Sequence, residues 1–181
     1  MKETKKRIIN VVLTIVVFVM SYLVYNTIAK PIAHQKEISK REKAIIARLE
    51  KAREAQLAFK EITGGKFANS WDTLIYVMKN GEINVEVQFG DADDSTTVFR
   101  KEIVKKPIYD ELFANYPLDS ILLVPYTNDT FEIATGEVEK NGVLLPTFQI
   151  TDPAPFNERR IENNNPLRVG NLFEADYNGN W

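Results

Sequence analysis

Three closely spaced carboxylates, Asp91, Asp93 and Asp94, are the side chains of this sequence whose spacing best suits metal chemistry. Carboxylates at alternate loop positions chelate Ca²⁺, which takes about six to eight oxygen ligands. The glycine and the distal glutamate of a helix–loop–helix calcium site are missing. The acidic cluster therefore predicts either a calcium site or, as the sequence favours, an acidic hairpin turn.

Other sets of catalytic residues are scarce in this sequence. It has one histidine, His34, and no cysteine, which excludes disulfides, thiolate metal sites and thiol catalysis. A Ser/His/Asp triad would need His34, which follows directly on an apolar segment, and no glycine-rich phosphate loop is present. The sequence therefore predicts a protein that is not an enzyme and that has no cofactor except, at most, Ca²⁺.

The first predicted element of the chain is an apolar segment from Ile8 to Ala29. It contains no charged side chain. As an α-helix it spans about 33 Å, enough to cross a hydrocarbon core of about 30 Å. It exceeds the apolar core of a signal peptide and is followed by no small-x-small cleavage site. The segment therefore predicts an uncleaved transmembrane helix, or signal anchor, in contact with lipid.

The charges that flank this helix predict its orientation. Residues 1–7 form a short tail with Lys2, Lys5, Lys6 and Arg7 against a single glutamate. The positive-inside bias keeps such a tail in the cytoplasm. We expect a single-pass protein of the inner (cytoplasmic) membrane, with the remainder of the chain in the periplasm.

Charge is also unevenly distributed beyond the membrane segment. Residues 30–60 are rich in lysine and arginine, residues 61–181 are rich in aspartate and glutamate, and the whole chain has a net charge of −2. The basic segment would attract anionic lipid, its own acidic region or that of a neighbouring copy, unless both regions are simply solvated. An acidic domain outside the cytoplasm argues against nucleic-acid binding.

Residues 30–62 predict a long stalk helix, because nothing except Pro31 interrupts them. Apolar residues recur at coiled-coil spacing, which makes this face a candidate interface for self-association or for other subunits. Its candidate contact residues are Ile38, Ile45, Leu49 and Ala52.

Residues 63–151 predict an α+β head domain. Ser70 is a candidate N-cap for a short helix that starts at Trp71, and Asn80–Gly81 ends this helix. Strict alternation over 83–89 predicts a strand. Further strands are expected at 97–104, 120–124, 130–135 and 142–150, with a helical turn at 108–113, so the helices would pack on one antiparallel sheet.

Residues 152–181 predict an irregular C-terminal tail that is partly disordered. This tail nevertheless carries large apolar residues, of which Phe173 and Trp181 are candidate contacts with the head or with a partner.

The stretch from Arg53 to Leu74 (REAQLAFKEITGGKFANSWDTL) resembles the helix end and following loop of pseudopilins, the pilin-like subunits of type II secretion systems. That resemblance implies a membrane helix continuous with a periplasmic helix that packs on an antiparallel sheet. The leader glycine and the early glutamate of pilin-like subunits are missing. Without these features, the chain is also similar to the bitopic assembly-platform proteins of the same machines, which have a short cytoplasmic tail, one membrane helix, a coiled-coil stretch and a small α+β domain.

These features predict a non-enzymatic bitopic subunit of an envelope-spanning secretion, motility or filament complex, which acts through protein–protein contacts. The alternative is a membrane-anchored sensory module whose acidic head binds a cation or a small ligand.

Overall fold

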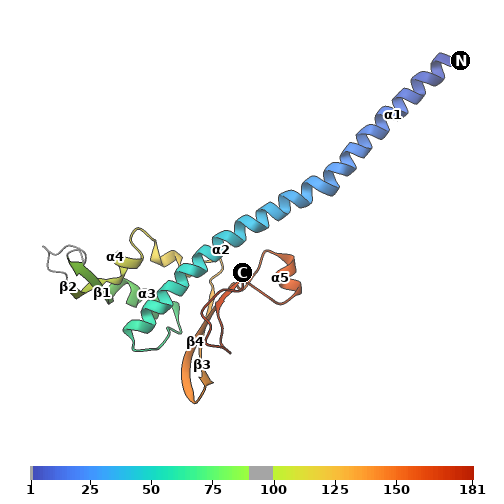
Figure 1. The fold of residues 1–181 in the computed structure, drawn as a ribbon. Coiled ribbons are helices and arrows are strands. Elements are labelled where there is room, and N and C mark those ends of the chain that lie inside the picture. Colours follow the sequence, from blue (N-terminus) through green and yellow to red (C-terminus); the bar gives the residue numbers. More distant parts are fainter. Residues whose placement is uncertain (1, 90–99) are drawn as a thin grey trace. The chain divides into compact units, whose positions relative to one another are not determined.

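The computed structural model describes residues 2–89 and 100–181, and their chain is α+β (Figure 1). It divides into two compact units, residues 1–42 and 43–181. The first unit is helical, and the second contains the strands and the shorter helices.

One continuous helix runs from the N-terminal region into the second unit. It comprises α1 (Lys2–Val24), a π-helical turn η1 (Tyr25–Ala29) and α2 (Lys30–Ile62). Gly64 and Gly65 follow it with φ angles of 71° and 112°, a left-handed conformation that glycine adopts without steric cost and that ends a helix. The predicted helical stretch and its glycine stop are confirmed.

The short helix after the glycines also forms as predicted. Helix α3 spans Trp71–Asn80, and the Ser70 hydroxyl accepts a hydrogen bond from the Thr73 backbone N–H at 3.4 Å. The chain then enters a two-stranded antiparallel sheet of β1 (Glu82–Phe89) and β2 (Arg100–Pro107), followed by α4 (Ile108–Leu112).

A second antiparallel sheet has the strand order β3–β4–β5. These strands are β3 (Glu132–Lys140), β4 (Val143–Thr151) and β5 (Arg168–Gly170). The prediction of one sheet is therefore wrong, because the described strands form two separate sheets. The tail is ordered and supplies β5 together with α5 (Glu158–Glu162).

Residues 120–124, predicted as a strand, instead form a series of turns after the 3-10 helix η2 (Leu118–Ser120). One guanidinium nitrogen of Arg48 on α2 donates to the carbonyl oxygens of Ser120 and Leu123, each at 2.9 Å. These carbonyls are thereby satisfied without a strand partner, and only an isolated bridge between Leu123 and Thr130 remains. A short apolar run does not by itself distinguish a strand from a buried turn.

The core of the second unit is built on one face of α2. Leu49, Ala52 and Ala55 on this face are fully buried, and the small alanines let other elements approach the helix closely. Its partners in the core come from α3, from the turns around η2 and from the three-stranded sheet, and include Trp71, Leu74, Ile121, Phe131, Phe148, Ile150, Leu167 and Val169.

A buried amide fixes the loop between α2 and α3. The Gln56 side chain is 0% exposed; it donates to the Ala68 carbonyl and accepts from the Ala68 N–H, both at 2.9 Å. Gln56 thus satisfies both backbone groups of a residue that lies in the core.

We predict that Gln56→Ala destabilises the second unit by about 2–4 kcal/mol, because it leaves a buried N–H and a buried carbonyl without partners. Urea unfolding of the detergent-solubilised chain measures the change, followed by tryptophan fluorescence in a Trp181→Phe background so that the signal comes from buried Trp71. Gln35→Ala on the exposed surface of the same helix is the matched control, with an expected change within about 0.5 kcal/mol. Equal stability of the two variants would contradict a structural role for the amide.

Candidate functional site

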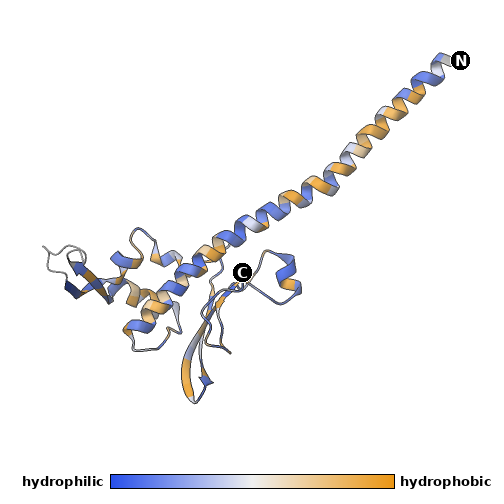
Figure 2. Ribbon diagram, viewed as in Figure 1, coloured by the Kyte–Doolittle hydropathy of each residue, from blue (hydrophilic) through white to orange (hydrophobic). Residues whose placement is uncertain are grey.

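The most distinctive surface of the described chain is the apolar stretch of α1. One helix near the N-terminus is long and apolar enough to span a membrane, and none of its most apolar stretch is buried within the chain. Phe18, for example, is 72% exposed, and hydrophobic residues occupy nearly every turn of this stretch (Figure 2). This continuous exposed apolar surface is compatible with a transmembrane helix or a signal anchor.

The π-helical turn η1 lies at the C-terminal end of this apolar stretch. Pro31, just beyond it, has no N–H to donate to the Thr27 carbonyl four residues earlier, and its ring would crowd that carbonyl in a regular α-helix. A π-turn widens the helix locally and relieves such crowding. The hydroxyl of Thr27 donates to the Leu23 carbonyl at 2.8 Å, and that of Thr14 donates to Asn10 at 2.9 Å, so both hydroxyls are satisfied without water.

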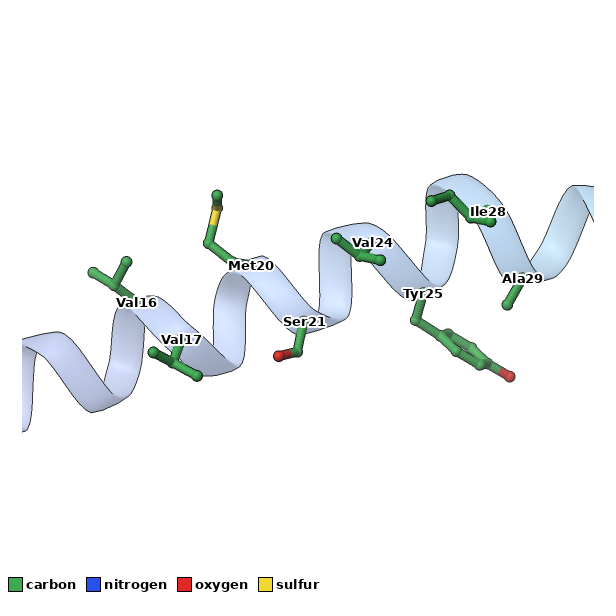
Figure 3. Close-up of a pocket in the computed structure, with 8 residues that line it drawn as sticks. All are labelled: Val16, Val17, Met20, Ser21, Val24, Tyr25, Ile28 and Ala29. Atoms are coloured by element: carbon green, nitrogen blue, oxygen red, sulfur yellow. The ribbon is translucent and has the colours of Figure 1, made fainter.

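Two rows of side chains spaced four residues apart line a shallow apolar groove on this helix (Figure 3). The first row contains Val16, Met20, Val24 and Ile28. The second contains Val17, Ser21, Tyr25 and Ala29, and its small members leave the groove open. Such a groove accommodates an acyl chain or the ridge of another helix.

The structure places the predicted stalk interface mainly inside the second unit. Ile45, Leu49 and Ala52 belong to the hydrophobic core, so their side chains contact residues of their own chain. Ile38 lies on α2 in the first unit; its side chain is also buried, but it does not belong to this core cluster. The seven-residue spacing thus corresponds to a helix face packed on a domain over residues 45–59.

Among the described large hydrophobic residues of the second unit, Phe173 is the most exposed, at 82%. Its loop is nonetheless held in place: the Phe173 N–H donates to the Asn171 side chain at 2.9 Å, and Thr147 donates to the Leu172 carbonyl at 3.3 Å. An aromatic side chain presented to solvent from a fixed backbone is typical of a protein contact site.

Trp181, the other predicted tail contact, is 42% exposed and its indole ring lies over Gly179. The neighbouring Asn180 holds this segment: its amide donates to the Pro166 carbonyl at 2.7 Å and its oxygen accepts from the Arg168 N–H at 3.0 Å. Part of the Trp181 side chain is therefore covered by its own chain and is not available to a partner.

Sequence reasoning missed the exposed apolar residues at the turn between β3 and β4. Val143 and Leu144 are 57% and 64% exposed. The signal was present in the sequence, because the strand after Asn141–Gly142 begins with three consecutive apolar residues, so that at least one of them faces away from the core.

The predicted cation ligands Asp91, Asp93 and Asp94 lie outside the described residues. Within residues 2–89 and 100–181, no group of three or more His, Asp or Glu side chains is arranged to hold a metal ion. His34 lies on α2 with an exposed side chain.

Asp152, directly after β4, is the buried carboxylate of the described chain, with 1% of its surface exposed. Burial raises the pKa of Asp152 above its ordinary value of about 4, and the nearby charge of Asp129 raises this pKa further. A hydrogen bond from the Ala154 N–H at 3.1 Å and the charge of Arg160 lower it in part.

An open hollow of about 420 Å³ lies beside the three-stranded sheet. Its polar lining includes Lys66, Glu137 and Thr147, next to the apolar ring of Phe67. The opposed charges of Lys66 and Glu137 make this a mixed polar surface.

The chain matches no protein-family model, no curated protein and no solved structure.

We predict that Asp152→Asn stabilises the second unit relative to the native chain as the pH rises above about 4. The raised pKa means that the folded state binds more protons than the unfolded state between the two pKa values, so native stability falls with increasing pH there. Asparagine keeps the acceptor for Ala154 and loses the charge. Thermal unfolding of both proteins between pH 4 and pH 7 measures the difference, which should widen with pH.

Glu132→Gln, which removes an exposed carboxylate from β3, is the control for Asp152→Asn. A stability difference between Asp152→Asn and the native chain that stayed constant over this pH range would contradict the assignment.

Proposed function

We propose that this protein is a non-enzymatic, single-pass membrane subunit of an envelope-spanning secretion, motility or filament complex. The apolar stretch of α1 anchors it, with residues 1–7 in the cytoplasm and the second unit in the periplasm. The observation that carries the proposal is the membrane-length apolar surface of α1, which the described chain leaves uncovered.

The packing of α2 supports a pilin-like role within such a complex. A membrane-length helix continues without interruption into a helix whose face forms part of the core of an α+β domain. This is the layout that the pseudopilin-like stretch Arg53–Leu74 implies, and Gln56 and Trp71 within that stretch make buried hydrogen bonds.

Action through protein contacts is supported by the exposed apolar residues of the second unit. Phe173, Val143 and Leu144 are more than half exposed, and all three belong to elements whose backbone is hydrogen-bonded. Exposed aromatic and aliphatic side chains on a rigid scaffold lose little conformational entropy when a partner covers them.

The topology test uses the fact that the native chain has no cysteine. We predict that, in intact spheroplasts, a membrane-impermeant maleimide labels Lys140→Cys and leaves Thr4→Cys unlabelled, while both become labelled after lysis. Both chains should stay in the pellet after alkaline carbonate washing. Release by carbonate, or labelling of Thr4→Cys from outside, would contradict the anchored orientation.

We predict that Phe173→Ser weakens capture of partner subunits in pull-downs from gently solubilised membranes. Loss of an exposed aromatic contact residue costs about 2 kcal/mol or more, which is about a thirty-fold loss of affinity. Tyr76→Ser on α3 is the matched control, because Tyr76 is also an exposed aromatic residue, at 69%. Recovery of the native chain only as a free monomer would contradict membership of a complex.

A further inference from the structure

One hydroxyl group in the groove of α1 has no hydrogen-bond partner among the described residues. The hydroxyls of Thr14 and Thr27 each donate to the carbonyl four residues earlier, whereas the Ser21 hydroxyl bonds to no residue that the structure describes. Figure 3 shows this hydroxyl on the row that also carries Val17 and Tyr25. Ser21 therefore places an unsatisfied polar group in the middle of the groove.

Ser21 lies deep in the hydrocarbon when α1 spans the membrane. It precedes Ala29, the last residue of the uncharged segment, by eight residues, which corresponds to about 12 Å of helix. Water and lipid headgroups do not reach this depth, and an acyl chain in the groove offers no hydrogen-bond acceptor. A hydroxyl in this position is stabilised by a polar partner on another helix.

The shape of the groove is complementary to a second copy of the same helix. Rows of side chains four residues apart form the ridges that interdigitate when two helices pack. The row from Val16 to Ile28 supplies such a ridge, and Ser21 leaves a gap in the row beside it. Because small residues let two backbones approach closely in a membrane, the gap suits the point at which two helices cross.

A second copy also supplies the missing hydrogen-bond partner at the same depth. Parallel copies share one orientation in the membrane, so their Ser21 residues lie at the same height. A serine hydroxyl both donates and accepts, so that of one copy can donate to that of the other. A different helix would need its own polar residue at this height.

We propose that α1 helices of two copies pack in parallel along this groove, with their Ser21 hydroxyls hydrogen-bonded to each other. The contact joins the same surface of both copies, so it is isologous and closes as a dimer. This inference rests on the proposed function, because it requires α1 to span the membrane, and it identifies a second copy of the chain as one partner.

The test again uses the cysteine-free chain. Single cysteines replace groove residues in the full-length chain, as Val17→Cys, Ser21→Cys and Val24→Cys, and membranes that contain each variant are oxidised with copper phenanthroline. We expect a disulfide-linked homodimer from each of these variants. Monomers alone from all three would overturn the proposal, and so would an adduct with a different protein in place of the homodimer.

Val19→Cys and Leu23→Cys are the matched controls for random encounters in the membrane. Each lies two residues from Ser21 and thus at nearly the same depth, but on the opposite face of the helix, since successive residues are about 100° apart. Both should remain monomeric under the same oxidation. Dimers formed equally from both faces would overturn packing along the groove.

Removal of the hydroxyl tests the hydrogen bond itself. In the Val24→Cys chain, Ser21→Ala keeps a small residue at the crossing and should weaken dimerisation by about threefold or more. Thr14→Ala is the matched control, because the Thr14 hydroxyl is already satisfied by Asn10, and should leave the dimer yield unchanged. An equal dimer yield from the Ser21→Ala and native-Ser21 chains would overturn the role of the hydroxyl.

Failure of dimerisation and failure of the proposed function give different results. Carbonate washing and maleimide labelling test the anchor, and the pull-down through Phe173 tests membership of a complex. A chain that stays in the carbonate pellet and captures other subunits without forming disulfide dimers would overturn only the packing of α1 on α1.

Release of the chain by carbonate would overturn both proposals.

Discussion

The paired hydrogen bonds between Gln56 and Ala68 are the constraint on which the second unit depends. They fix the loop that leaves α2, and this loop carries Phe67 into the core and brings Ser70 to the start of α3. With α3 in place, the Trp71 indole N–H donates to the Phe131 carbonyl at 2.7 Å, just before β3 begins. One buried amide thus links the long helix, the short helix and the larger sheet.

A second set of contacts attaches the tail to the same loop. The rings of Phe148 and Tyr177 stack with their centroids 5.7 Å apart, and Phe67 lies within 5.2 Å of Tyr177. The ammonium of Lys60 on α2 lies 4.9 Å from the Tyr177 centroid, and the Tyr177 hydroxyl donates to Pro146 at 2.9 Å. Residues from the helix, the loop, the sheet and the tail therefore share one cluster.

The elements with strong local signals were predictable from sequence. The serine cap of α3, the alternation of β1 and the glycines that end α2 each act within a few residues, so they need no tertiary information. The turns around Ser120 and Leu123 were not predictable, because Arg48 is distant in sequence. The same limit applies to β5, a strand of three residues that pairs with the end of β4.

Sequence alone also predicted the candidate contact residues only in part. Spacing along α2 located an apolar face correctly but did not say what covers it, and the structure places Ile45, Leu49 and Ala52 in the chain's own core. Exposure of Phe173 depends on the loop held by Asn171 and Thr147, which no periodic pattern indicates. By contrast, the apolar stretch of α1 is a property of composition and length, and sequence alone suffices to find it.

The late position of β5 has a consequence for biosynthesis. A ribosome delivers the chain from its N-terminus, so the buried face of α2 emerges long before Phe148, Leu167 and Val169, which share its core. This apolar face therefore lacks part of its core until β5 has been synthesised. A truncation before Leu167 would remove Leu167 and Val169 and leave part of the apolar face of α2 exposed to solvent.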